Sequence, residues 1–265
     1  MGSKNGDSNA TIVSVADALS QDYGVFDRQP HSTVKDMLSF LRSSVRDNGF
    51  ETILDIGCGV GSVTRLIAGF FDKSQIIGVD ISREMLNKAD NIRMPNLRYV
   101  LADASGLPFE KSTVSCAVLI NSWHLMRDRT AVVNELRRVL APNGTVMVVG
   151  IERDKLKYEF FHQQLPNFHK KDYQQHDSLD SLISRFNENG FTYTDSKTYA
   201  YSTRIGNAEE TLSFLVRKPF FSLRLLTDEE FESDLRHFRR WLAESEIKET
   251  VKNGVSTLAI FKKEG

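Results

Sequence analysis

Short apolar runs alternate with amphipathic stretches through the first part of this 265-residue chain. The apolar runs have the length of buried strands and lie at residues 52–56, 75–80, 97–102, 114–120 and 145–151. The amphipathic stretches have apolar residues at helical spacing and lie at residues 62–71, 82–93 and 130–140. Strands and helices that alternate in this way predict an α/β fold, a parallel sheet with helices on both faces.

The segments on either side of this core, residues 49–152, are less regular. Residues 1–10 are small and polar and predict a disordered tail, and the segment 11–48 that follows has helical spacing at 11–24 and 32–47. Residues 153–176 are polar and aromatic without a clean period. The elements predicted beyond them are helices at 178–189, 207–216 and 227–245 and strands at 191–203 and 255–262. Within the remainder, 153–265, we expect residues 153–177 and 204–250 to form a helical lid over a substrate.

Three glycines, Gly57, Gly59 and Gly61, follow the first predicted strand. Glycine permits positive φ and close approach of a ligand, and the next helix begins with free N–H groups. Their G-x-G-x-G spacing differs from the G-x-G-x-x-G of dinucleotide sites, and Asp55 precedes the first glycine by two positions. A carboxylate there would repel a pyrophosphate and attract an ammonium or sulfonium group. The alternative is a plain tight turn that caps a helix.

Polar residues also follow the next three strands. Asp80 can accept hydrogen bonds from ribose hydroxyls, or it can cap the following helix. Asp103 can hold the amino group of an adenine, or it can be a turn residue. Asn121 and His124 follow the fourth strand. Because ligands of open α/β sheets bind at the carboxyl ends of the strands, we expect one site along this edge.

Four stretches of the core together resemble the class I S-adenosylmethionine-dependent methyltransferases, most closely the small-molecule, type 11-like branch. They are residues 53–61, 78–82 with Met85-Leu86, 102–104 with 107–109, and 135–144. The resemblance implies a Rossmann-like, mostly parallel seven-stranded sheet with an antiparallel last strand and helical lid insertions. These motifs are specific for the superfamily but do not name a substrate.

The resemblance also implies a cofactor, S-adenosyl-L-methionine, and the residues that bind it. Asp55 and the glycine loop would line its methionine part with Asn121, and Asp80 would bind its ribose. The full set is Tyr23, Asp55, Gly57, Cys58, Gly59, Gly61, Asp80, Ile81, Met85, Asp103, Ala104 and Asn121. Tyr23 would close over the cofactor from the segment 11–48, or it is a core aromatic. One departure is Ser115, where the family usually has an aspartate in a mostly structural role.

The acceptor side is less defined by the sequence. His124 is the candidate general base, since a histidine pKa lies near neutrality; the alternative is a packing or orienting role. The candidate substrate-pocket residues share aromatic character, with ordinary packing as the alternative, and are Trp123, Phe160, Phe161 and His162. No metal site is expected, because neither cysteine has metal-ligand spacing.

The composition of the chain argues against nucleic acid and membrane lipid as binding partners. The net charge is −1, so no global basic field attracts nucleic acid or anionic lipid. The basic run at residues 236–240 is interleaved with acids, as on a solvated helix face. No apolar run approaches the roughly 18 residues of a membrane span. Two isolated cysteines and a polar N-terminus favour a cytoplasmic protein.

The sequence therefore predicts direct in-line methyl transfer to O, N or C of a small-molecule acceptor, by a monomer or homodimer, with S-adenosyl-L-homocysteine as product. Three alternatives remain. A regulator or cyclase would bind the cofactor without methyl transfer, and an NAD-dependent oxidoreductase would share the sheet. A protein or nucleic-acid methyltransferase is the third, although residues 121–124 lack the prolines of the amino-methylating nucleic-acid enzymes.

Overall fold

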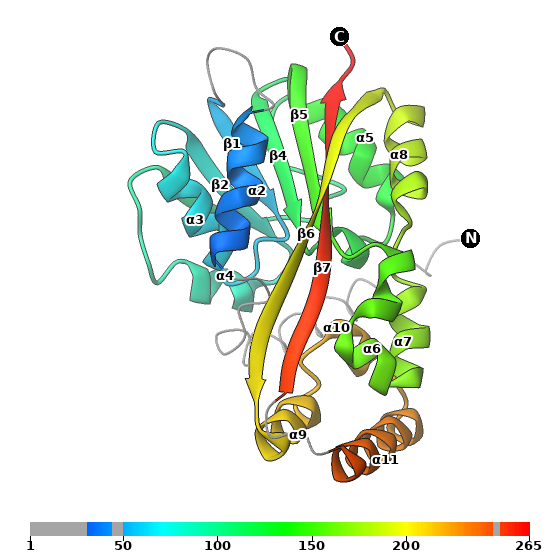
Figure 1. Cartoon of the computed structure of the whole chain (residues 1–265). Helices are drawn as coiled ribbons and strands as arrows, with labels where there is room; N and C mark the ends of the chain where they lie inside the picture. The colour runs from blue at the N-terminus through cyan, green and yellow to red at the C-terminus, as the bar shows by residue number, and fades with distance from the viewer. Residues whose placement is uncertain (1–30, 44–49, 246–249) are drawn as a thin grey trace, which may run out of the picture. The chain divides into compact units, whose positions relative to one another are not determined.

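The computed structural model describes residues 31–43, 50–245 and 250–265 (Figure 1). The predicted helix at 11–24, the tail and Tyr23 lie outside these residues. The chain divides into two compact units. We call residues 31–150, 179–199 and 257–265 the sheet unit, and the described residues of 151–178 and 200–256 the helical unit.

One seven-stranded sheet has the strand order β3-β2-β1-β4-β5-β7-β6 (Figure 1). The strands are β1 Thr52–Ile56, β2 Gln75–Asp80, β3 Leu97–Leu101, β4 Val114–Ile120, β5 Leu140–Gly150, β6 Phe191–Gly206 and β7 Thr250–Lys263. The first five are parallel in their pairings, whereas β7 is antiparallel to β5. The predicted fold is confirmed, including the antiparallel last strand.

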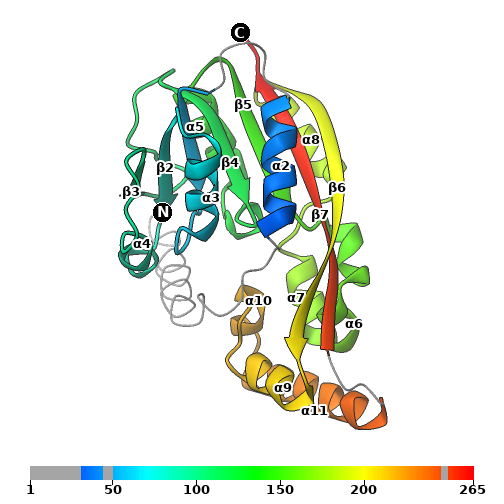
Figure 2. The same ribbon diagram turned by 60° about the vertical axis from the view of Figure 1, so that its left-hand side comes forward.

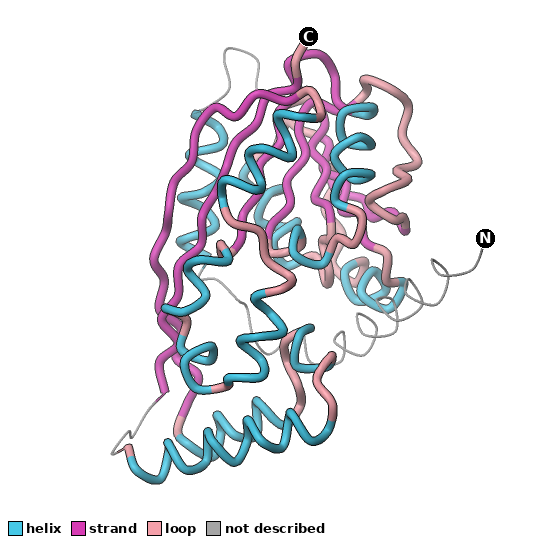
Figure 3. Tube along the Cα trace, turned by 90° about the vertical axis from the view of Figure 1, so that its right-hand side faces the viewer, coloured by secondary structure: helices cyan, strands magenta, loops and turns pink. Residues whose placement is uncertain are grey.

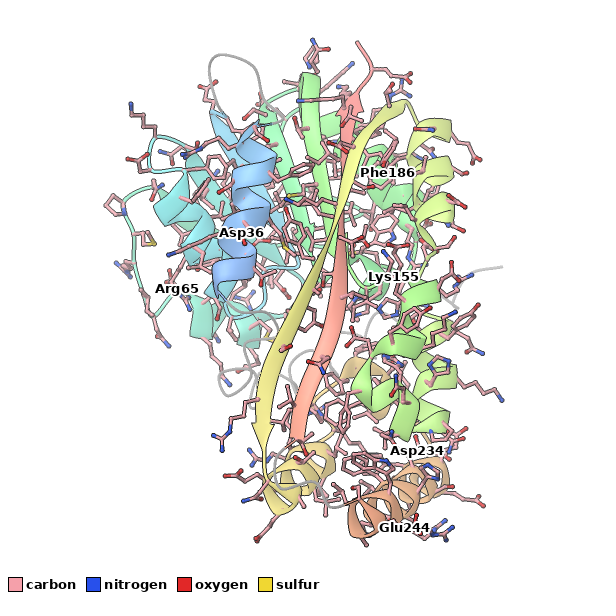
Figure 4. The ribbon with its side chains drawn as sticks, viewed as in Figure 1. Asp36, Arg65, Lys155, Phe186, Asp234 and Glu244 are labelled. Carbon is pink, nitrogen blue, oxygen red and sulfur yellow. The ribbon has the colours of Figure 1, made fainter. Side chains whose placement is uncertain are left out.

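Helices cover both faces of the sheet unit (Figures 1 and 2). They are α2 His31–Ser43, α3 Ser62–Phe70, α4 Arg83–Ala89, α5 Arg129–Val139 and α8 Leu179–Glu188. Successive strand residues point to opposite faces. Leu54 therefore packs in one core with α5 and α8, whereas its neighbour Ile53 packs in the other with α2 and α3. On the α8 side, the ring of Phe186 stacks on Phe261 with centroids 4.1 Å apart (Figure 4).

The predicted boundaries differ from the observed ones where strands run on. The chain resumes strand structure at Leu140, directly after α5, and the β4–β5 register shifts from Val114/Leu140 to Cys116/Thr145. The intervening residues 141–144, which lie between the predicted helix 130–140 and the predicted strand 145–151, therefore form an irregularity inside β5. Strands β6 and β7 are also longer than predicted, and α4 ends at Ala89.

The side chain of Ser115 in β4 bonds to the backbone of β1 just before the β1–β4 pairing begins at Ile53/Cys116. Its hydroxyl accepts a hydrogen bond from Thr52 N at 2.9 Å and donates to Thr52 O at 2.7 Å. Both backbone groups at the start of β1 are thereby satisfied. The position where the family usually has an aspartate is structural in this chain.

The helical unit contains more helix than the sequence predicts (Figure 3). Its elements are the 3-10 segment η2 Arg153–Tyr158 and the helices α6 Phe160–Gln164, α7 Pro166–Tyr173, α9 Ala208–Val216, α10 Phe221–Arg224 and α11 Asp228–Glu244. A capping box begins α11: Thr227 Oγ1 accepts from Glu230 N at 3.2 Å, and Glu230 Oε2 accepts from Thr227 N at 2.9 Å. An aromatic-rich core of its own holds this unit together.

The start of α7 is fixed by a residue far along the chain. Asp234 of α11, 1% exposed, accepts from Asn167 N at 3.0 Å and from Phe168 N at 2.8 Å (Figure 4). Its carboxylate thus takes the place of a local N-cap, which Leu165 cannot supply. Residues 153–176 lack a clean helical period because their helices are short and are completed by such distant contacts.

Candidate cofactor site

The glycine loop lies between β1 and α3. Gly57, Gly59 and Gly61 have φ of 74°, 55° and 73°, the left-handed conformation that favours glycine. Gly57 N and Cys58 N both donate to Val79 O of β2, at 2.7 and 3.1 Å. The loop is therefore fastened to the carboxyl end of β2.

Asp80 joins this loop to the next helix. One carboxylate oxygen accepts from Gly59 N at 2.8 Å, and the other accepts from Ser82 N at 2.9 Å. The hydroxyl of Ser82 in turn accepts from Met85 N at 3.1 Å, as predicted for the cap of α4. The side chain is 9% exposed. These bonds fix the Asp80 carboxylate at the edge where the sequence predicts a ribose.

Asp55 lies deeper, beneath the glycine loop. It is 2% exposed, and one of its oxygens accepts from Thr64 Oγ1 of α3 at 2.7 Å. Burial raises the pKa of this carboxyl from 3.8 to about 7, with a further contribution from the negative charge of Asp80. The sequence predicts that Asp55 carries a negative charge. In the structure its pKa lies near neutrality, so a cationic group nearby would stabilise the charged form.

The β3 end of the edge carries the residues predicted to meet the adenine. Ala102 N donates to Asp80 O at 3.0 Å, which brings this end beside β2. Asp103 Oδ1 accepts from both the backbone N and the hydroxyl of Ser105, at 2.9 and 2.8 Å. Ala104 is buried. Asp103 thus shapes a turn, and its contact with a ligand stays a prediction, as do those of Ile81 and Met85.

The β4 end carries Asn121 and His124. Asn121 has φ of 54°, and its N–H donates to Val149 O at 2.8 Å. His124 lies in the 3-10 segment η1 Trp123–Leu125 and is half-buried. Arg129 Nη2 donates to His124 O at 3.2 Å and so fixes the backbone of this segment. Trp123 points into the core of the sheet unit, with its ring 5.5 Å from that of Phe186.

Phe160, Phe161 and His162 belong to the helical unit. Phe161 is 2% exposed and packs against Phe214 of α9, and His162 lies 3.3 Å from the carboxylate of Asp172. Burial lowers the pKa of His162 despite that carboxylate. These three side chains build the core of their own unit, and their part in a substrate pocket stays a prediction.

Three residues of the site were not found from the sequence. Thr64 and Ser122 hydrogen-bond to Asp55 and to Ile56 O, and Tyr99 of β3 lies against the loop. A Cβ on Gly61 would come 2.2 Å from the Tyr99 hydroxyl. That hydroxyl is buried, and among the described residues it has no hydrogen-bond partner. Ser122 could have been found from its place just after the end of β4. The place of Tyr99 beside the loop follows only from the β2–β3 register, which the sequence pattern does not give.

Two findings concern possible metal ligands and thiols among the described residues. Within residues 31–43, 50–245 and 250–265, no group of three or more His, Cys, Asp or Glu side chains could hold a metal ion. Burial raises the pKa of both Cys58 and Cys116, which disfavours their thiolates. The helices in these same ranges include none that is long and apolar enough to cross a membrane.

Comparison with known proteins agrees with the resemblance seen in the sequence. Residues 53–144, which contain the glycine loop, Asp80, Asp103 and Asn121, match the model of a methyltransferase domain. This domain match supports the predicted resemblance to the class I S-adenosylmethionine-dependent methyltransferase superfamily.

Among curated relatives, the chain is 31% identical over 109 residues to an O-methyltransferase, cnsE, of Penicillium expansum, covering 39% of each protein. It is 35% identical over 96 residues to a trans-aconitate 2-methyltransferase of Methylobacterium radiotolerans, covering 36% of each. The match therefore spans about two fifths of the length of these relatives.

Several solved structures share the fold over more of the chain. The YcgJ protein of Bacillus subtilis aligns with a TM-score of 0.60 and 18% identity over 87% of this chain and 99% of that one. A putative methyltransferase of Bacillus halodurans aligns with a TM-score of 0.62 and 16% identity, over 88% of this chain and 100% of that one. A phosphoethanolamine N-methyltransferase 2 of Haemonchus contortus, bound to S-adenosylhomocysteine, aligns with a TM-score of 0.53 and 18% identity. This alignment covers 87% of this chain and 53% of that one. At these identities the likeness is one of fold.

Proposed function

We propose that the chain is an S-adenosyl-L-methionine-dependent methyltransferase that acts on O, N or C of a small-molecule acceptor. The observation that carries the proposal is the Asp80 carboxylate, which a 2.8 Å hydrogen bond joins to Gly59 of the glycine loop. A ribose acceptor and a loop open to close backbone approach thus lie together at the carboxyl edge of the sheet.

The residues present suit the chemistry of this cofactor. Asp80 would accept the ribose hydroxyls, and Ile81, Met85, Asp103 and Ala104 would surround the adenine. Asp55, whose buried carboxyl has its pKa raised to about 7, would gain from an adjacent positive charge, whether ammonium or sulfonium. A pyrophosphate would instead add negative charge beside Asp55 and Asp80. This electrostatic difference favours S-adenosylmethionine over NAD.

The bound cofactor supplies a methyl group that its positive sulfur already activates. The protein would then act mainly by orienting the acceptor and excluding water. A base is needed only where the acceptor atom must lose a proton, as a hydroxyl does. His124, half-buried and on a segment whose backbone Arg129 fixes, is the proposed base.

Several relatives support a small-molecule acceptor by their names, among them a tocopherol O-methyltransferase and a demethylmenaquinone methyltransferase. A net charge of −1 gives no long-range attraction for nucleic acid. One structural neighbour, from Haloferax volcanii, forms a complex with the Trm112 methyltransferase activator, with a TM-score of 0.59. For this chain we propose a monomer or homodimer in the cytoplasm, without a membrane or nucleic-acid partner.

Isothermal titration calorimetry with S-adenosylhomocysteine, S-adenosylmethionine and NAD tests the cofactor. We expect both sulfur ligands to bind the parent, and Asp80→Asn to weaken them at least about tenfold, a change of about 1.4 kcal/mol. Asp90→Asn is the matched control, since Asp90 is exposed at the opposite end of α4. Binding of NAD alone, or equal affinity in parent and Asp80→Asn, would overturn the proposal.

Methyl transfer itself needs a second assay. Release of S-adenosylhomocysteine is measured with a panel of small hydroxy, amino and carboxylic acids and quinols. Turnover with at least one class supports an enzyme, whereas tight cofactor binding without release from any acceptor would favour a regulator or cyclase. His124→Ala with full turnover on the same acceptor would remove His124 from the mechanism.

A further inference from the structure

Two serines, one in β4 and one just past its end, hydrogen-bond to the backbone of the neighbouring strand β1. Ser115 does so at the start of the pair, through Thr52, and Ser122, just past the end of β4, donates to Ile56 O at 2.6 Å. The β1–β4 register runs only as far as Asp55/Val118. The Ser122 bond therefore adds a link beyond the ladder, one residue before the glycine loop.

Ser122 also fits closely against the first glycine of that loop. A Cβ on Gly57 would lie 2.5 Å from Ser122 Cβ and 3.1 Å from its hydroxyl oxygen. Gly57 is thus required twice, once by its φ of 74° and once by the space that Ser122 occupies. Ser122 is 3% exposed, so water does not compete for its hydroxyl.

The residue before Ser122 is held in an uncommon conformation. Asn121 has φ of 54°, which residues other than glycine adopt rarely. On one side, Asn121 N donates to Val149 O at 2.8 Å, and on the other, Ser122 O accepts from Leu125 N at 2.9 Å. This left-handed turn directs the chain from the end of β4 toward β1, and the Ser122 bond to Ile56 closes it.

We propose that Ser122 is a positioning residue that sets the gap between Gly57 and Asn121, across which the cofactor lies; this inference rests on the proposed function. On the β2 side, Val79 O and the Asp80 carboxylate fasten the glycine loop. On the β4 side, the Ser122 hydroxyl fastens it. Without this bond the edge can spread, and a ligand that spans it must restore the spacing on binding, which lowers its affinity.

The test compares Ser122→Ala with Ser115→Ala. Both variants remove a hydroxyl that donates from β4 to a β1 carbonyl, at 2.6 and 2.7 Å, but at opposite ends of the strand pair. Two quantities are measured for each and for the parent: the affinity for S-adenosylhomocysteine by calorimetry, and the midpoint of urea unfolding. We expect both variants to unfold at lower urea, whereas only Ser122→Ala binds the ligand more weakly, by about tenfold.

The outcomes separate the inference from the function on which it rests. Equal affinity in Ser122→Ala and the parent, or equal weakening in both variants, would overturn the positioning role and leave the proposed function standing. A parent that binds no S-adenosylhomocysteine would overturn both. If Ser122→Ala does not fold, Ser122→Cys replaces it, because its thiol is a weaker donor of similar shape, and the same order of affinities is expected.

Discussion

The buried carboxyl of Asp55 gives the sheet unit a stability that depends on pH in a definite direction. Its pKa is raised from 3.8 to about 7, chiefly because burial disfavours the anion. An acid whose pKa is higher in the folded state binds a proton there that the unfolded chain has already lost. The free energy of unfolding therefore falls as pH rises between about 4 and 7, and is flat above that range.

Asp55→Asn removes this dependence, since an amide does not titrate. A shift of roughly three pKa units corresponds to about 4 kcal/mol. We therefore expect the stability of the variant minus that of the parent to increase by up to about 4 kcal/mol from pH 4 to pH 7.5. Any change in the hydrogen bond with Thr64 would shift this stability difference by the same amount at every pH. Other titrating groups are common to both proteins and cancel, apart from the electrostatic coupling between Asp55 and Asp80.

The assay uses the two tryptophans of the chain. Trp123 lies in the core of the sheet unit and Trp241 packs in the helical unit, so a Trp241→Phe background reports the sheet unit alone. Urea unfolding is followed by Trp123 fluorescence at half-unit steps of pH. Two parallel stability curves would refute the reasoning, because they would mean that Asp55 is already ionised at pH 4. Adding S-adenosylhomocysteine should lower the pKa of Asp55 and flatten the difference.

Three further substitutions test the packing described above. Tyr99→Phe removes a buried hydroxyl without a partner among the described residues, and should leave stability unchanged or raise it by about 1 kcal/mol in thermal unfolding. Gly61→Ala should cost at least about 2 kcal/mol, since its φ is 73° and its Cβ would lie 2.2 Å from the Tyr99 hydroxyl; a wild-type melting temperature would contradict this. Asp234→Ala removes the carboxylate at the start of α7 and should cost about 2 kcal/mol, with earlier amide exchange at Phe168, whereas exchange in α3 serves as the unchanged reference.

The sheet was predictable because its strands depend on local pattern. The apolar runs, the glycines and Asp80 place the first five strands and the edge that they share, and the bonds of Asp80 to Gly59 and Ser82 connect loop and helix along it. The antiparallel last strand was expected from the resemblance to a family. Periodicity alone does not give strand direction.

The remainder depended on contacts between distant positions. The start of α7 depends on Asp234, which lies 67 residues from Asn167. Ser122 becomes part of the site only through the ends of β1 and β4, and Tyr99 only because the β2–β3 register places it beside Gly78. The raised pKa of Asp55 likewise follows from burial, which the residue type alone does not indicate.

Strands β6 and β7 have a consequence for how such a chain can diversify. The hydroxyls of Thr198 and Thr257 lie 3.2 Å apart, close to where the chain leaves the sheet unit after Tyr199 and returns to it at Thr257. The segment 200–256 is thus inserted between neighbouring positions of β6 and β7, and its described residues comprise the last part of β6, the helices α9, α10 and α11, and the first part of β7. An insertion at this point can change in length without altering the strand order of the sheet unit.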